Sequence, residues 1–157
     1  DFGHRSIEQT LMTDIMPSVE AFKHAKKHMA AWSRDEARPQ MFPLGLIGAK
    51  SKVVYQPKGV VGVIAPWNFP IGMVMAPMSG ILAAGNRAMV KMSENSRHLT
   101  QLMQDRMPAY FHNDKLEFIE GAEGAGQAFS KQPFDYLLFT GSGQTGSAVM
   151  AAASPCP

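Results

Sequence analysis

One six-residue motif near the end of the chain has the residue types that hold a phosphate. Residues Gly141 to Gly146 read GSGQTG and match the pattern G-x-G-x-x-G. Glycines allow a ligand to approach the backbone closely, and the free N–H groups at a helix N-terminus attract anions. However, the match follows the fourth strand of the expected unit, and no acidic residue about 20 positions further on is available. A tight glycine turn without a ligand therefore remains the alternative.

A second candidate pair is Lys91 and Glu94, which lie three positions apart just after an apolar run. A carboxylate at this place accepts hydrogen bonds from the hydroxyl groups of a ribose, and a lysine can flank it. The alternative is an ion pair on the protein surface.

The third candidate is Asn68, in the stretch GVVGVIAPWNFP between Gly59 and Pro70. Its side-chain amide could donate a hydrogen bond to a developing oxyanion. Alternatively, the asparagine tolerates an unusual backbone conformation or caps the helix that follows.

Two other groups of residues are weaker candidates. His24 and His28 are four positions apart in KHAKKH, but without a visible third ligand a solvated basic helix face is the favoured interpretation over a metal site. Cys156 lies in SPCP at the end of the chain with no base or oxyanion site ordered around it, so we interpret it as an incidental residue.

The elements that would position these residues alternate along the chain. Apolar residues from Ile7 to Trp32 recur at helical spacing, and Pro17 is expected to divide this stretch into two helices or to kink it. A polar connection follows. The expected strands are 51–56, 59–65, 87–92, 116–120 and 135–139. Helical patterns follow each strand from residue 59 onward, which predicts an α/β fold with a Rossmann-like, mainly parallel sheet, flanking helices and a preceding N-terminal helical segment.

Composition excludes several classes of protein. A net charge of +2 gives no reason to expect a nucleic-acid or membrane partner. There is no apolar run long enough to span a membrane, and the polar N-terminus is unlike a signal peptide. A single cysteine fits a reducing, cytoplasmic compartment. We therefore expect a soluble cytoplasmic protein that binds no metal.

Three motifs in order, GVVGVIAPWNFP, LAAGNRAMVKMSENS and FDYLLFTGSGQTG, resemble the aldehyde dehydrogenase superfamily. The stretches DFGHRS and VKMSENSRHLT are most similar to its coniferyl aldehyde dehydrogenase branch. The resemblance implies NAD(P)-dependent oxidation of an aldehyde, including coniferyl or another aromatic aldehyde, to a carboxylic acid through a cysteine thioester. It also implies that the parent enzyme is a homo-oligomer.

The resemblance also assigns roles to residues of this sequence. Asn68 would stabilise the oxyanion of the thiohemiacetal, and Lys91 and Glu94 would hold the adenosine ribose. The remaining cofactor-binding residues implied are Ala65, Pro66, Trp67, Gly141, Ser142 and Gly146. Glu94 favours NAD slightly over NADP, because a carboxylate repels a 2′-phosphate, although Lys91 and Ser93 could accommodate one.

The sequence departs from the family pattern in its tail, MAAASPCP. The catalytic cysteine and general-base glutamate of the family would follow the FTGS helix, and Cys156 matches neither. We therefore expect an internal fragment: an N-terminal helical segment and connection over residues 1–50, then a partial NAD(P)-binding domain over residues 51–157, with 51–58 as a candidate strand of a bridging region. The alternatives are a stand-alone dinucleotide-binding module and an inactive truncated product.

Overall fold

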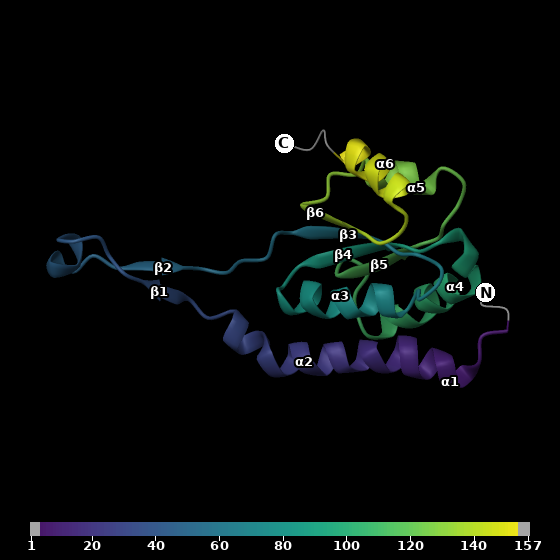
Figure 1. Ribbon diagram of the computed structural model, residues 1–157, viewed down its shortest axis with the longest axis horizontal. Helices are drawn as coiled ribbons and strands as arrows, with labels where there is room; N and C mark the ends of the chain where they lie inside the picture. The colour runs from purple at the N-terminus through teal and green to yellow at the C-terminus, as the bar shows by residue number, and fades with distance from the viewer. Residues whose placement is uncertain (1–3, 154–157) are drawn as a thin grey trace.

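The centre of the fold is a four-stranded parallel sheet, seen in a computed structural model that describes residues 4–153 (Figure 1). The order of its strands in space is β5 (Leu116–Ile119), β4 (Arg87–Lys91), β3 (Val60–Ile64) and β6 (Tyr136–Phe139). β3 comes first in sequence, so the winding reverses on passing from β4 on one side of it to β6 on the other. Open α/β sheets bind ligands outside the carboxyl ends of their strands at such a reversal. The predicted fold class is confirmed.

Helices cover both faces of this sheet, as its parallel connections require. α3 (Gly72–Ala83) and α4 (Arg97–Arg106) lie on one face, and α5 (Ala125–Ser130) and α6 (Gly143–Ala153) lie on the other (Figure 1). Two 3₁₀ turns, Glu94–Ser96 and Met107–Ala109, flank α4.

The core lies mainly between the sheet and the α3 and α4 layer. β3 and β6 are short apolar runs, as expected for a sheet that is covered on both faces. Core residues from these elements are almost wholly buried: Val61, Val63, Val74, Met78, Val90, Met92, Leu116 and Phe118. Met78, Met92 and Met103 are all buried in this core, where they fit an adaptable packing role, since Met fills irregular gaps.

The N-terminal segment forms a helical path that runs along α3 (Figure 1). It comprises α1 (Ile7–Thr10), a π-helical turn (Leu11–Ile15) and α2 (Met16–Trp32). Pro17 was expected to divide or kink this stretch. The helical path continues through Pro17, and its hydrogen-bond pattern changes from π-helical to α-helical at Met16. Pro17 lies in the first turn of α2, where its missing N–H costs little.

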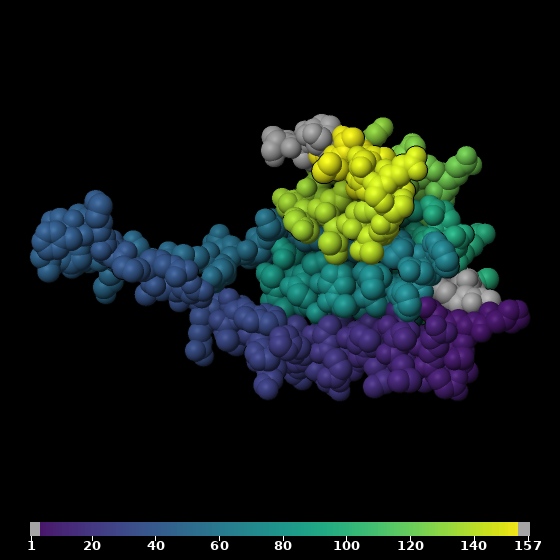
Figure 2. Space-filling model, viewed as in Figure 1, coloured from purple at the N-terminus to yellow at the C-terminus, as the bar shows by residue number. Residues whose placement is uncertain are grey.

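A two-stranded hairpin stands clear of the body, as Figure 2 shows in space-filling form. β1 (Glu36–Arg38) pairs antiparallel with β2 (Ser51–Val53), and a 3₁₀ turn, Leu44–Ile47, lies at the tip. The sequence pattern predicted a connection where β1 lies and a longer strand at β2. β1 lacks the alternation of apolar residues that would predict a strand, and its pairing with β2 stabilises it. Hydrogen bonds from Lys52 to Asp35 and from Tyr55 to Glu36 also link the two sides of the hairpin.

The remaining expectations concern a membrane-spanning helix and Cys156. No helix within residues 4–153 is long and apolar enough to cross a membrane. Cys156 lies outside the described residues.

Candidate functional site

The loops that carry the candidate residues meet at the carboxyl edge of the sheet. Backbone hydrogen bonds continue past the strand ends, from Thr140 N to Ile64 O (3.1 Å) and from Ala65 N to Lys91 O (3.1 Å). The loops after β3, β4 and β6 are therefore held side by side. This arrangement brings three of the segments selected from the sequence to one edge.

Lys91 and Glu94 form an ion pair beside β4. The Lys91 side chain is 6% exposed, whereas that of Glu94 is 53% exposed, so the pair spans from the interior to the surface. Partial burial acts to raise the pKa of the Glu94 carboxyl. Hydrogen bonds from Lys91 and from its own backbone outweigh that effect and leave the pKa below its ordinary value of 4.5.

The pair lines a cavity of about 460 Å³ between α5 and α6. The lining combines this charged pair with Ile64 of β3 and with mostly small or polar residues of the two helices: Gly126, Gln127, Ser130, Gln144, Thr145, Ala148, Val149 and Ala152. Gly126 is close to the ammonium group, since a Cβ there would lie 3.8 Å from Lys91 Nζ. Small residues leave room for a flat group, and the ion pair offers both a donor and an acceptor to sugar hydroxyls.

Gly121, at the end of β5, allows the next loop to pack against the one that holds Glu94. A Cβ at Gly121 would lie 2.7 Å from Glu94 N and 2.8 Å from Met92 O. Both contacts are with backbone atoms that cannot rotate away. The glycine is therefore required for the close approach of these two loops.

The GSGQTG motif forms the turn between β6 and α6. Ser142 accepts a hydrogen bond from Thr145 N (3.3 Å), and its hydroxyl lies 2.9 Å from that of Thr145, which is the geometry of an N-terminal cap. Gly141 approaches the Phe139 ring so closely that a Cβ would lie 2.5 Å from it. A Cβ at Gly146 would lie 3.2 Å from the same ring. The glycines thus serve packing of the turn on β6, while Gln144 and Thr145 present the start of α6 to the cavity.

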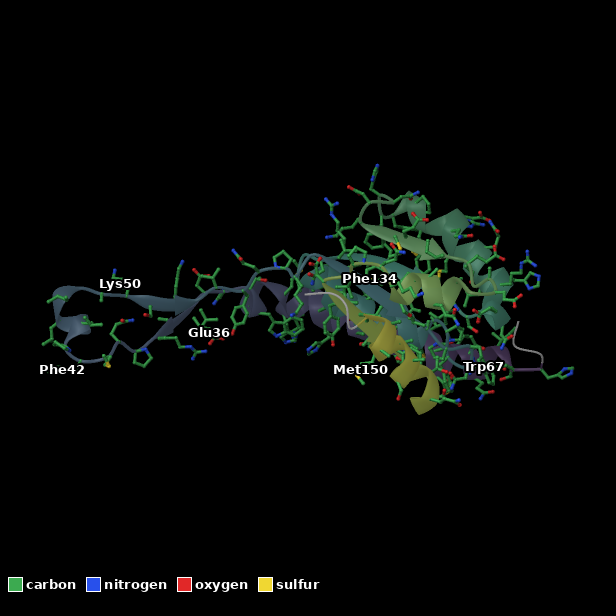
Figure 3. The ribbon with its side chains drawn as sticks, turned by 90° about the horizontal axis from the view of Figure 1, so that it is seen from above. Glu36, Phe42, Lys50, Trp67, Phe134 and Met150 are labelled. Carbon is green, nitrogen blue, oxygen red and sulfur yellow. The ribbon has the colours of Figure 1, made fainter. Side chains whose placement is uncertain are left out.

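Ala65, Pro66, Trp67 and Asn68 follow β3 on the adjoining loop. Ala65 is buried, whereas Trp67 and Asn68 are exposed, and none of the four belongs to the cavity lining. The N-cap position of α3 is Ile71, and the carboxylate of Asp14 accepts from the first helical N–H, at Gly72. Asp14 therefore performs the capping function considered for Asn68. Figure 3 shows Trp67 at the end of the molecule opposite Phe42.

The two histidines of α2 lie away from this edge. The rings of His24 and His28 are 4.2 Å apart; His24 is exposed and His28 is half-buried. In the part of the chain that the structure describes, no group of three or more side chains could hold a metal ion. A solvated helix face remains the interpretation of this pair.

Several residues of the site were not selected from the sequence. Gln127, Ser130 and Gln144 line the cavity, and Arg5 and Asp14 contact the Asn68 loop. The glycine-rich residues 121–126, GAEGAG, are typical of a loop, but this pattern does not indicate which side chains face inward. No local pattern signals Arg5 or Asp14, because their partners lie about 60 positions away.

The sheet order and the cavity at its carboxyl edge define the class of Rossmann-like nucleotide-binding folds. The chain belongs to the aldehyde dehydrogenase family, whose family model matches residues 5–156. It is 46% identical over 154 residues to a coniferyl aldehyde dehydrogenase from Pseudomonas sp., a match that covers 98% of this chain and 31% of that enzyme. The resemblance inferred from the three motifs is confirmed.

Solved structures agree with this assignment. The substrate-bound state of Staphylococcus aureus AldH superimposes with a TM-score of 0.85 and 34% identity, covering 92% of this chain and 31% of that one. PnpE in complex with nicotinamide adenine dinucleotide gives a TM-score of 0.77 and 27% identity, covering 91% of this chain and 29% of that one. The chain spans about a third of the length of the curated relatives that it matches.

Proposed function

We propose that this chain is the cofactor-binding part of an NAD(P)-dependent aldehyde dehydrogenase that oxidises an aldehyde to a carboxylic acid. The main observation is the position of the Lys91–Glu94 ion pair, at the edge of the cavity between α5 and α6 and at the reversal of the sheet. A dinucleotide is the ligand that this class of crevice binds, and the solved structure of PnpE is a complex with nicotinamide adenine dinucleotide. The division at residue 50 into an N-terminal segment and a partial cofactor domain stays part of this proposal.

The residues at the edge fit the adenosine and diphosphate parts of such a cofactor. Lys91 and Glu94 would hydrogen-bond the adenosine ribose, while Gly126, Ala148 and Ala152 leave space beside them. Gly141, Ser142 and Gly146 at the start of α6 would face the diphosphate, favoured by the helix N-terminus. Ala65, Pro66 and Trp67 would border the groove. The bound nicotinamide would supply the hydride acceptor for oxidation of the aldehyde.

We propose that Asn68 donates its side-chain N–H to the aldehyde oxygen when a thiolate adds to the carbonyl carbon. The exposed position of Asn68 on the loop after β3 leaves its amide accessible to a substrate. In this mechanism a cysteine other than Cys156, from the rest of the enzyme, would supply the thiolate. The thiohemiacetal would become a thioester by giving a hydride to the nicotinamide, and water would then hydrolyse the thioester to the acid. Loss of one oxyanion donor typically lowers kcat by about 100- to 1,000-fold.

The proposal favours NAD over NADP and an aromatic aldehyde over other substrates. Glu94 would repel a 2′-phosphate, which supports NAD. Relatives described as coniferyl aldehyde dehydrogenases, at 46% and 44% identity, support coniferyl or another aromatic aldehyde. We further propose a homo-oligomer, because the hairpin tip exposes apolar side chains such as Phe42 and Ile47, each 80% exposed. A cytoplasmic location is also proposed, because the sequence has a single cysteine.

A stand-alone dinucleotide-binding module and an inactive product are the competing proposals. A thermal melt of the purified chain with and without millimolar NAD⁺ separates them, since a ligand that binds only the folded state raises Tm. An upward shift supports binding, and a cooperative melt without any shift argues against it. A chimera then tests activity, with this chain replacing the matching segment of the Pseudomonas coniferyl aldehyde dehydrogenase. If Asn68→Ala leaves kcat of an active chimera unchanged, the proposed role of Asn68 is wrong.

A further inference from the structure

We propose that Arg5, just before α1, and Asp14, in the π-helical turn, are positioning residues that hold the loop between β3 and α3, which carries Asn68, in place. This inference rests on the proposed role of Asn68 as an oxyanion donor. It adds two residues from a separate element to the site, neither of which has a place in the cofactor cavity.

Arg5 contacts the loop at Asn68 itself. Its Nη2 donates a hydrogen bond of 2.6 Å to the backbone oxygen of Asn68, which is 63 positions away in the sequence. Its guanidinium also lies over the ring of Phe69, 4.6 Å from the centroid. The Arg5 side chain is 12% exposed although Asn68 itself is exposed. A hydrogen bond from a charged guanidinium is stronger than one between neutral groups, and the contact with the aromatic ring adds to it.

Asp14 contacts the other end of the same loop. One oxygen of its carboxylate accepts a hydrogen bond from Gly72 N at the start of α3, and the other lies 3.7 Å from Arg5 Nη1. The side chain of Asp14 is 1% exposed. A carboxylate at a helix N-terminus is stabilised by the helix dipole and satisfies an N–H group that the helix leaves unpaired. Together the two charged residues fix the backbone at both Asn68 and Gly72.

Gly72 is the residue that admits Asp14 to this position. A Cβ there would lie 2.7 Å from Asp14 Oδ1, closer than carbon and oxygen can approach. Asp14 can therefore approach the backbone here only because residue 72 has no side chain. This complementarity between two elements indicates a specific contact rather than a chance one.

The π-helical turn orients Asp14 toward the loop. Asp14 lies within Leu11–Ile15, where Met16 N bonds to Leu11 O, five positions back. The hydroxyl of Ser18 donates to the backbone oxygen of Asp14 at 2.6 Å, so the turn is tied to the next turn of α2. Single π turns occur frequently at functional sites, where they redirect a side chain.

Oxyanion stabilisation depends on a donor that is fixed before the reaction, so loosening of the loop should lower kcat more than it changes cofactor binding. A merely structural ion pair would act differently. Its loss would reduce the stability of the whole fold, without a specific effect at Asn68.

The first test uses NMR spectra of the ¹⁵N-labelled 157-residue chain. The side-chain amide signals of Asn68 are assigned by their loss in Asn68→Asp. We expect Arg5→Met to shift or broaden the signals of Asn68 and Phe69, with those of Val63 and Val90 in the sheet unchanged. Arg5→Lys should partly restore them, because lysine keeps the charge and can donate hydrogen bonds but lacks the planar guanidinium. The matched control is Lys23→Met, in an exposed ion pair with Glu20 on the same helical path.

The proposal is overturned if Arg5→Met leaves the Asn68 signals the same as Lys23→Met does, or if signals throughout the sheet change equally. Gly72→Ala gives an independent check from the other side of the contact. It should disturb the Asn68 signals without removing any charge.

Kinetics in the chimera separate this inference from the proposed function. Arg5→Met should lower kcat by roughly 10- to 100-fold, as expected for a misplaced catalytic group, with little change in the affinity for NAD⁺. The same substitution should have little further effect in an Asn68→Ala background, because the group that it positions is gone. Full effects of Arg5→Met in both backgrounds would overturn the positioning role. No effect of Asn68→Ala alone would overturn the oxyanion role, while the NMR comparison would still decide whether Arg5 holds the loop.

Discussion

Lys91 and Glu94 form an ion pair in which one partner is buried and the other reaches solvent, with side-chain exposures of 6% and 53%. The lysine comes from the end of β4 and the glutamate from the 3₁₀ turn that follows it. The pair therefore links the sheet edge to the cavity between α5 and α6. A ligand that enters this cavity meets a charged pair already held in place by the backbone.

We predict that Glu94→Ala abolishes the increase in Tm that NAD⁺ produces in the purified chain, because the ribose loses its acceptor. Differential scanning fluorimetry with a titration of NAD⁺ measures this change. Glu20→Ala is the matched control, since Glu20 forms an exposed i,i+3 pair with Lys23 far from the cavity. Equal Tm shifts in Glu94→Ala and in the parent chain would refute the assignment of the cavity to the ribose.

The lowered pKa of Glu94 gives a prediction for the pH dependence of stability. Because its pKa lies below the ordinary 4.5 in the folded state, ionised Glu94 stabilises the fold at higher pH, and the contribution is lost as pH falls through the folded-state pKa. We expect the parent chain to melt above Glu94→Gln at pH 7 and the difference to shrink on acidification below about pH 4.5. A difference that is constant across this range would contradict the ion-pair explanation. Since Glu94 is half exposed, the difference should be small.

We predict that Gly121→Ala destabilises the chain by about 1–3 kcal/mol, because its Cβ would collide with backbone atoms of Met92 and Glu94. The measurement is chemical denaturation followed by circular dichroism. Gly80→Ala is the control, since a Cβ at that position in α3 would meet nothing within 4 Å. Alanine is favoured over glycine in a helix, so Gly80→Ala should be neutral or stabilising. The loss of NAD⁺ binding in Gly121→Ala should exceed that in Gly80→Ala.

The hairpin tip gives a prediction about assembly. Replacing Phe42 and Ile47, each 80% exposed, by serine should reduce self-association without lowering Tm, since neither side chain supports the core. Figure 3 shows Phe42 at the far end of the hairpin, away from the body. Sedimentation velocity over a range of protein concentrations measures the association. An unchanged distribution of species would exclude the tip as the interface.

Much of the architecture follows from local patterns in the sequence. Apolar runs bounded by glycine, proline and asparagine indicated β3 through β6 to within a residue or two, because a strand buried on both faces needs such a run. The placement of Asn68, Lys91 and Gly141 immediately after strands predicted that they share one edge, since parallel strands end on the same side of a sheet. The resemblance to the family came from motifs of the same local kind.

Other features depended on tertiary contacts between distant residues. β1 formed where the sequence pattern was that of a connection, because its hydrogen bonds come from β2. The helical path continues through Pro17 as α2, and both α2 and the π-helical turn before it pack against α3. The cap of α3 is a carboxylate 58 positions earlier in the chain, and the carbonyl of Asn68 is held by an arginine 63 positions earlier. The sequence by itself determined the order and type of the elements, because those depend on neighbouring residues. Only the fold decided which charged side chains lie against the Asn68 loop, because that depends on how α1, α2 and α3 pack.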